Sequence, residues 1–157
     1  MTRVILMRHA KSSWSKPGLS DHARPLNARG RGSAKALGEW LHAGGYVPDL
    51  TLCSDAARTQ ETWRGLQLDT PVRFRADLYL AGAEHMLTQL ALAEVRTVLL
   101  IGHNPGVAML AAGLVQSPPA HPRFADYPTG ATLVVDCADV AWGQGRVVDF
   151  AVPRELV

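Results

Sequence analysis

Short apolar runs alternate with longer amphipathic segments along this 157-residue chain. The first run, RVILM over residues 3–7, is continuous and bounded by charge, which is typical of a strand buried on both faces of a sheet. The same reasoning predicts strands over residues 3–7, 49–53, 72–79, 97–102, 131–136 and 146–152. Between them the pattern predicts helices from Asn27 to Gly44, over 54–67 and 83–94, and from Asn104 onward.

Capping residues mark where these helices begin and end. Asn27 and Ser54 are expected as N-caps, because their short polar side chains can accept a hydrogen bond from the first turn. Asn104 is expected to cap the fourth helix, with Pro105 at its first position. Gly44 and Gly45 should end the first helix.

Strands that alternate with helices indicate an α/β protein. We expect a three-layer α/β/α sandwich with a mostly parallel, mixed central sheet, formed by residues 1–157 as a single domain. The last two strands could pair as a hairpin or lie as neighbours in the sheet. Residues 116–130 hold four of the ten prolines and are expected to form a long loop, which in a compact domain tends to be functional.

Composition narrows the class of protein. Arginine supplies 13 of the 16 basic residues, which suits bidentate recognition of anions, although a GC-rich genome would give the same bias. A formal net charge of +2, without a lysine-rich run, gives no support for nucleic-acid binding. Cys53 and Cys137 lack metal-ligand or redox spacing and are expected to be buried thiols. The N-terminal apolar run is too short for a signal peptide or membrane span, so we expect a cytosolic protein, with a monomer as the default.

Four side chains able to bind an anion follow the predicted strands. Arg8 and His9 come directly after the first strand, Arg58 lies in the first turn after the second, and His103 follows the fourth. Ligands of parallel sheets bind at the carboxyl ends of the strands, so these residues should meet at one edge. Two arginines, two histidines and a helix N-terminus suit a doubly charged oxyanion such as phosphate. Few carboxylates accompany them, which favours a site without a metal or other cofactor.

These residues lie in motifs that resemble a known family. RHAKSSW, RPLNARG, CSDAARTQET and IGHNPG, in this order, are similar to the histidine phosphatase superfamily, whose fold is called phosphoglycerate mutase-like. The first two motifs favour its small, SixA-like phosphohistidine phosphatase branch. The resemblance covers roughly residues 3–136 and matches Arg8-His9-Ala10, the Ser54, Arg58 and Thr62 spacing, and His103 to the family pattern.

The resemblance implies covalent catalysis. His9, neutral at its attacking nitrogen, would form a phosphohistidine that water then hydrolyses. Arg8, Arg58 and His103 would surround the equatorial oxygens of the phosphoryl group. A protonated His103 is the expected form, because a bound phosphate raises the pKa of a neighbouring histidine.

The proton donor is less clear from the sequence. Larger family members carry a glutamate soon after the third strand, where this chain has Tyr79 and, several residues later, Glu84. Asp21 is the preferred candidate, because the loop after the first motif should fold over the pocket. A site without an acid is the third alternative, since a phosphoramidate nitrogen can be protonated before it leaves.

Nearby residues receive smaller roles. Lys11 and Ser12 could bind the phosphate or its carrier, and Lys11 could equally be a solvated surface residue. Arg24 is expected to fix the loop through a salt bridge or to meet an acidic partner. Trp14 could form a wall of the pocket.

The sequence therefore predicts a metal-independent phosphatase acting on phosphohistidine in a protein, such as a phosphotransfer domain. The short chain favours a shallow site that can admit a side chain carried on a bulky partner. A phosphatase of small phosphate monoesters is the first alternative. A catalytically silent module that binds phosphate or phosphoproteins is the second.

Overall fold

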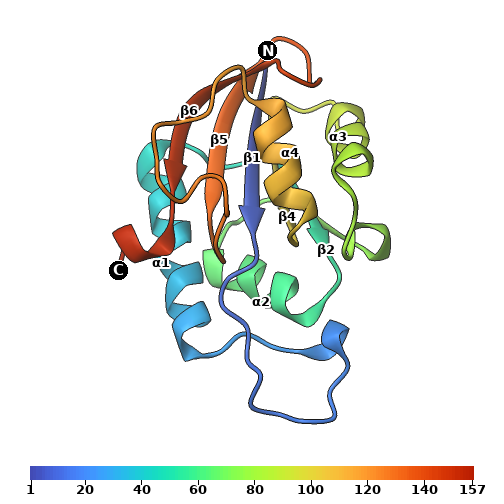
Figure 1. Ribbon diagram of the computed structural model, residues 1–157, viewed down its shortest axis with the longest axis vertical. Coiled ribbons are helices and arrows are strands. Elements are labelled where there is room, and N and C mark those ends of the chain that lie inside the picture. The colour runs from blue at the N-terminus through green and yellow to red at the C-terminus, as the bar shows by residue number, and fades with distance from the viewer.

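A six-stranded sheet lies between two layers of helices in the computed structural model, which describes all 157 residues (Figure 1). The strands are β1 (Thr2–Arg8), β2 (Leu50–Ser54), β3 (Val72–Arg75), β4 (Thr97–Gly102), β5 (Thr132–Cys137) and β6 (Gly145–Ala151). Their order is β3-β2-β4-β1-β5-β6, in which β1 to β4 are parallel while β5 and β6 run antiparallel to their neighbours. The expected three-layer sandwich with a mixed, mostly parallel sheet is confirmed.

The central strand explains why the molecule has two helical layers. Val4 and Leu6 of β1 point into a core of 22 buried residues on one face of the sheet. Ile5 and Met7 point into a second core of 10 buried residues on the other face. Alternate side chains of a strand face opposite sides, so a continuous apolar run needs cover on both.

Two helices cover each face. The helices are α1 (Ala28–Gly44), α2 (Ala57–Leu66), α3 (Ala83–Leu92) and α4 (Gly106–Leu114). Leucines of α1 and α2 enter the smaller core, whereas leucines of α3 and α4 enter the larger one. Four parallel strands with crossing helices place all of the βα turns at one edge of the sheet, the lower end in Figure 1.

Most of the predicted helix limits are confirmed, and two are corrected. Asn27 caps α1 by accepting a hydrogen bond from the Gly30 amide, and Gly45 ends it with a φ of 71°. Ser54 does not cap α2, which begins after Ala56, because Ser54 is the last residue of β2. Pro105 is the N-cap of α4 rather than its first residue.

Asn104 still supports the start of α4, because its side-chain oxygen accepts a hydrogen bond from the Ala108 amide.

The third strand is shorter than predicted. β3 ends at Arg75, and residues 76–78 form a 3₁₀ turn. The carboxylate of Asp77 binds the Arg75 guanidinium at 2.6 and 2.9 Å, and Leu78 turns into the larger core. The last two strands pair as an antiparallel hairpin, which was one of the two predicted arrangements.

The long loop over residues 116–130 contains neither a helix nor a strand, as predicted, yet it is part of the core. Phe124 and Tyr127 are buried in the larger core, and the Tyr127 hydroxyl donates a 2.6 Å hydrogen bond to the carbonyl of Leu6. The loop is thereby fixed to β1, directly before the residues that follow this strand.

Both cysteines are buried free thiols, and burial raises the pKa of each. No helix combines the length and the apolar character that crossing a bilayer requires.

Candidate active site

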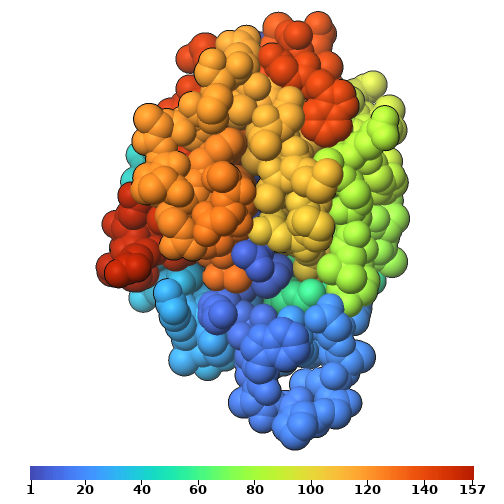
Figure 2. Space-filling view, viewed as in Figure 1, coloured from blue at the N-terminus to red at the C-terminus, as the bar shows by residue number.

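The four predicted anion-binding residues meet at the carboxyl edge of the sheet. Arg8 ends β1, His9 follows it, His103 follows β4, and Arg58 lies in the first turn of α2. Together they line a cavity of 400 Å³ with the loop that follows β1. The predicted convergence of residues from three strand ends is therefore confirmed. Figure 2 shows that the loop, in blue, protrudes from the lower end of the molecule.

His9 is held as a neutral imidazole with one defined tautomer. Its Nδ1 lies 2.7 Å from the carbonyl oxygen of Ala10, so Nδ1 must carry the proton and donate it. The Nε2 atom consequently keeps its lone pair, and the Arg58 Nε–H points at it from 3.3 Å. Burial, reinforced by Arg58 and Arg8, lowers the pKa of His9 to about 3. His9 is thus a buried, neutral imidazole whose Nε2 carries a free lone pair at neutral pH.

Thr62 of α2 links Arg58 to the backbone of Ala10. Arg58 and Thr62 are four residues apart in α2 and so lie on the same face. The Thr62 hydroxyl accepts a hydrogen bond from the Ala10 amide at 3.1 Å and donates one to the Arg58 carbonyl at 2.7 Å. This contact fixes the backbone beside His9 relative to α2.

His103 packs against His9, with ring centroids 5.3 Å apart. Its Nε2 lies 2.8 Å from the hydroxyl of Ser54, at the end of the neighbouring strand. Burial, together with the neighbouring His9 and Arg58, lowers the pKa of His103 to about 3. His103 is therefore neutral in the free site, and the protonated form expected with phosphate bound stays a prediction, because a bound anion raises the pKa of a neighbouring histidine.

Polar atoms without partners are concentrated in this site. Four buried side-chain atoms of the chain lack a hydrogen-bond partner, and two of them are Arg8 Nε and His103 Nδ1. Burial and repulsion from Arg58 lower the pKa of Arg8, which makes a single 3.3 Å bond to the Tyr127 carbonyl. Unsatisfied buried groups cost free energy and are characteristic of functional sites.

Asp21 lies in the site, but its environment opposes the predicted role of proton donor. Its carboxylate accepts hydrogen bonds from the Tyr79 hydroxyl, from Arg58 at 3.0 Å and from Arg24 at 3.1 Å. The Tyr79 contact, followed by those to Arg58 and Arg24, holds the pKa of Asp21 well below its usual range. An ionised carboxylate at neutral pH has no proton to donate. Instead, the Asp21 carboxylate accepts a hydrogen bond from the Arg58 guanidinium, so this guanidinium already has an anionic partner in the free site.

Glu84, the other carboxylate considered, is exposed in the first turn of α3 and is absent from the lining of the cavity. Its position agrees with an acidic residue that favours a helix N-terminus.

The loop after β1 is held by Arg24, which forms the predicted salt bridge. Besides Asp21, its guanidinium donates to the Ser12 hydroxyl at 2.9 Å and lies 3.5 Å from the centroid of the Trp14 ring. Ser12 lines the cavity, but its hydroxyl is engaged by Arg24. Lys11 also lines the cavity and is exposed. Trp14 is 74 % exposed and forms part of the wall, as predicted.

No group of three or more histidine, cysteine, aspartate or glutamate side chains is arranged to hold a metal ion.

Comparisons with known proteins agree with this geometry. The family described as "Histidine phosphatase superfamily (branch 1)" matches residues 4–80. An uncharacterized protein from Mycobacterium tuberculosis is 34 % identical over 159 residues, which cover 94 % of this chain and 100 % of that protein. A candidate phosphohistidine phosphatase SixA from Agrobacterium tumefaciens is 32 % identical, with a TM-score of 0.80 over 97 % of this chain and 98 % of the other. The chain belongs to the histidine phosphatase superfamily.

A further structure similar to this superfamily member is that of the protein histidine phosphatase SixA complexed with tungstate. It is 25 % identical, with a TM-score of 0.81, and the match covers 99 % of this chain and 100 % of that one.

Two residues of this histidine phosphatase fold have structural roles that the sequence did not reveal. Ser54 was interpreted as a helix cap, but its hydroxyl binds His103. Tyr79 was noted only as a replacement for a carboxylate, but its hydroxyl binds Asp21 and its ring packs edge-on against His103, with centroids 5.3 Å apart. The spacing of Ser54, Arg58 and Thr62 was the available signal for Ser54. Tyr79 had none, because its partner is 58 residues away.

Proposed function

We propose that this protein is a phosphatase that hydrolyses phosphohistidine on another protein, with His9 as the nucleophile. The observation that carries the proposal is the tautomer of His9, because its Nδ1–H is bound to Ala10 and its Nε2 lone pair faces Arg58 in a cavity that Arg8 and His103 also line. A nitrogen nucleophile beside groups that stabilise a phosphoryl anion fits a covalent mechanism.

The first step transfers the phosphoryl group. The lone pair of His9 Nε2 attacks phosphorus, and the phosphorus–nitrogen bond of the substrate breaks on the opposite side. The departing imidazole nitrogen keeps the electron pair of that bond and receives a proton from solvent. Arg8, Arg58 and His103 stabilise the charge on the equatorial oxygens, once Arg58 has exchanged Asp21 for the phosphoryl group.

The second step restores the enzyme. Water attacks the phosphorus of phosphorylated His9, the new phosphorus–nitrogen bond breaks, and its electron pair returns to Nε2. The water oxygen leaves in inorganic phosphate as H2PO4−, which releases one proton to solvent to form HPO4²⁻. Throughout both steps the Nδ1–H bond to Ala10 keeps the ring in place.

The state of Asp21 favours a phosphoramidate over an alkyl ester as the substrate. An alkoxide leaving group needs a proton from the enzyme, and the carboxylate beside this site is ionised at neutral pH. The nitrogen of a phosphoramidate can be protonated before it leaves. The similarity to proteins described as SixA phosphohistidine phosphatases, 25 % and 32 % identical, supports the same choice.

The test measures phosphate release from a phosphohistidine peptide and from p-nitrophenyl phosphate, with EDTA present. His9→Ala is compared with the wild type, and His42→Ala is the control because His42 binds a carbonyl within α1, outside the cavity. We expect turnover of the peptide by the wild type and His42→Ala, and none by His9→Ala. An acid-labile phosphoryl label should be trapped on the wild type and on His42→Ala, but not on His9→Ala.

Each other outcome contradicts a different part of the proposal. Turnover of p-nitrophenyl phosphate alone indicates a phosphatase of small monoesters. Peptide turnover that survives in His9→Ala removes His9 as the nucleophile. A folded protein that binds phosphate without turning over either substrate is a binding module.

A further inference from the structure

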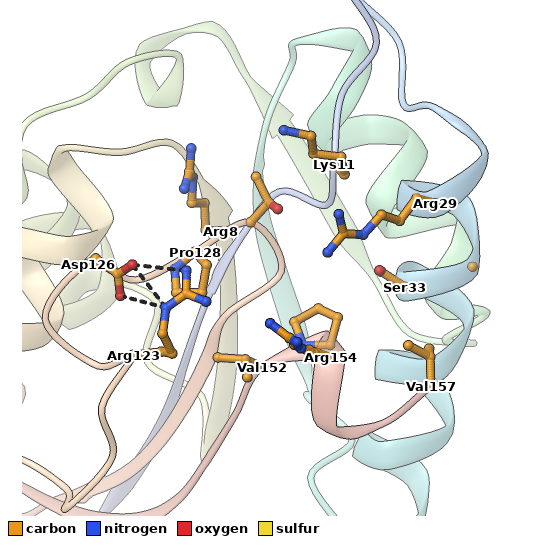
Figure 3. A pocket seen from close by; sticks show the side chains of 13 residues that line it. Arg8, Lys11, Arg29, Ser33, Arg123, Asp126, Pro128, Val152, Arg154 and Val157 are labelled. Atoms are coloured by element: carbon orange, nitrogen blue, oxygen red, sulfur yellow. Dashed lines mark hydrogen bonds and ion pairs between the residues drawn. The ribbon is translucent and has the colours of Figure 1, made fainter.

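A basic groove adjoins the catalytic cavity, and the chemistry proposed above does not use most of it. The groove has a volume of 620 Å³, and three residues that line it, Arg8, Lys11 and Thr129, also line the catalytic cavity. An extended ligand with its phosphoryl group at His9 could therefore continue into the groove without a break. Figure 3 shows the groove between α1, the loop over residues 116–130 and the 3₁₀ turn near residue 154.

The groove carries strongly unbalanced charge. It is lined by five basic side chains and one acidic side chain, whereas the whole chain has a formal net charge of only +2. The basic residues are Arg8, Lys11, Arg29, Arg123 and Arg154. The single acid, Asp126, is paired with Arg123 at 2.9 Å, so that pair is neutral. The remaining cations have nothing in the groove to balance them.

Three of these cations are free to meet a partner. Lys11, Arg29 and Arg154 are exposed, and none of the three takes part in an ion pair of the chain. In Figure 3 Arg29 projects from α1, and Arg154 from the C-terminal turn, into the space between them. Their exposure suits long-range attraction and a loosely bound anionic chain better than a closed small-molecule pocket.

Arg29 also lies where it opposes local stability. The first turn of α1 contains no acidic residue and places Arg29 and Arg31 at the positive end of the helix dipole. Cations there are unfavourable, and acidic residues are the usual choice. A residue type that destabilises its own helix is expected where the side chain has a role in recognition.

The lining of the catalytic cavity also includes exposed apolar side chains. Trp14 and Leu80 line the cavity and are 74 % and 56 % exposed. An exposed aromatic residue with surrounding arginines is the composition of a protein–protein interface. The site thus combines exposed apolar side chains with an adjoining basic groove, a composition that fits a protein surface better than a small metabolite.

We propose that the groove containing Lys11, Arg29 and Arg154 binds acidic side chains that flank the phosphohistidine of a protein substrate. The inference rests on the proposed function, because it assigns the chemistry of the substrate around the phosphoryl group. It predicts that selectivity arises from charge outside the catalytic cavity, and that it weakens as salt screens the groove.

The test uses two short phosphohistidine peptides that differ only in flanking residues, glutamates in one and glutamines in the other. Free phosphohistidine is the third substrate. The variant is Arg29→Gln with Arg154→Gln, and the matched control is Arg73→Gln with Arg96→Gln. Arg73 and Arg96 are exposed arginines outside both cavities, so the two double variants lose the same charge.

We expect the groove variant to lose about tenfold in kcat/KM on the glutamate peptide at low salt, through KM, and less than twofold on the other substrates. The control should change less than twofold on all three. High salt should remove the difference between wild type and variant. The groove variant should unfold at the same or a higher temperature than wild type, because a cation leaves the N-terminus of α1.

Two results would overturn the proposal. Equal loss on all three substrates would place the effect in the cavity, and equal rates on both peptides in the wild type would show that flanking charge is not recognised. A small bisphosphate hydrolysed by the wild type in preference to the glutamate peptide, with the same dependence on Arg29 and Arg154, would assign the groove to a small dianion.

A binding measurement separates this proposal from the proposed function. The unphosphorylated glutamate peptide, fluorescently labelled, should bind wild type and control more tightly than the groove variant. If wild type turns over no phosphohistidine but still binds this peptide through Arg29 and Arg154, the proposed activity is wrong. The proposal that the groove binds acidic side chains is then still supported. If turnover occurs and binding is identical in all three proteins, the groove proposal fails alone.

Discussion

The catalytic cavity and the basic groove both contain arginines but hold them in opposite ways. In the cavity Arg58 is 3 % exposed and each of its nitrogens is hydrogen-bonded, to His9 or to Asp21. In the groove Arg29 and Arg154 are exposed and unpaired. Buried and ordered cations are in place before a phosphoryl group arrives, which suits stabilisation of a transition state. Exposed cations lose conformational freedom on contact, which suits recognition.

The sharpest test of this contrast removes a buried arginine. Arg58→Ala should lower kcat/KM on the phosphohistidine peptide by about 10³-fold, because an oriented donor in a buried site is lost. Arg64→Ala on the same helix is the control, since Arg64 is exposed and bonds only to Gln60. The two variants should be assayed under identical conditions. A loss below tenfold in Arg58→Ala would mean that burial does not distinguish the two regions.

The buried histidines should also make the stability of the fold depend on pH. Their pKa near 3 in the folded state lies below the ordinary 6.5, so between these values the unfolded chain binds more protons. The unfolding free energy should therefore be fully present above pH 6.5 and fall below it, by about 1.4 kcal/mol per pH unit for each histidine that stays neutral.

Denaturant titrations at pH 7, 6 and 5 measure this effect, with pH values chosen to bracket the ordinary histidine pKa. His9→Gln should reduce the slope, because it removes one of the two buried histidines whose pKa is lowered by folding. An unchanged slope in His9→Gln would show that His9 titrates normally in the folded state.

A smaller effect is expected at the hydroxyl that positions His103. Ser54→Ala should lower kcat/KM about tenfold, because the hydrogen bond that orients His103 is lost from a buried site. Ser15→Ala, an exposed serine of the loop after β1, is the control. The NMR titration of His103 with phosphate bound should shift in Ser54→Ala, whereas a merely structural defect would leave it unchanged.

The smallest effect on catalysis is expected from substitution of Asp21, an exposed residue whose carboxylate contacts the buried Arg58. Asp21→Asn should change kcat on the phosphohistidine peptide by less than about fivefold, far below the 10²-fold or more that loss of a general acid causes. The physical reason is that Asp21 is already ionised at neutral pH. The KM should fall, because Arg58 no longer exchanges an anionic partner for the substrate. A loss of 10²-fold in kcat would restore Asp21 as the proton donor.

The sequence predicted those features that depend on local order. The apolar runs located all six strands, and Arg8, His9, Arg58 and His103 were predicted together because each follows a strand that must end at the same edge. The protonation states were not predictable in the same way. His103 has an ordinary pKa in isolation, and only its burial against His9 and Arg58 lowers it.

Long-range pairs account for the other errors. Ser54 follows the sequence rule for an N-cap, yet it binds His103, 49 residues away. Asp21 stays an untested candidate for the proton donor, although Tyr79, Arg58 and Arg24, which the sequence did not place near it, surround its carboxylate. The end of β3 was missed because an ion pair between Arg75 and Asp77 accompanies the turn into the core. Each error concerns a partner that hydrophobic periodicity does not report.

The two ends of the loop after β1 are held together by hydrogen bonds, so the number of residues between them can change without altering the rest of the fold. Its two ends are joined by bonds from Asn27 to Lys11 and from Ser13 to Pro25, at 3.0 and 2.8 Å, and Gly30 passes so close to the Lys11 carbonyl that a Cβ would collide with it. Residues between these ends can be added or removed with little cost to the closed base. The fold could therefore acquire a longer lid, and with it a new substrate range, while the sheet and its nucleophile stay unchanged.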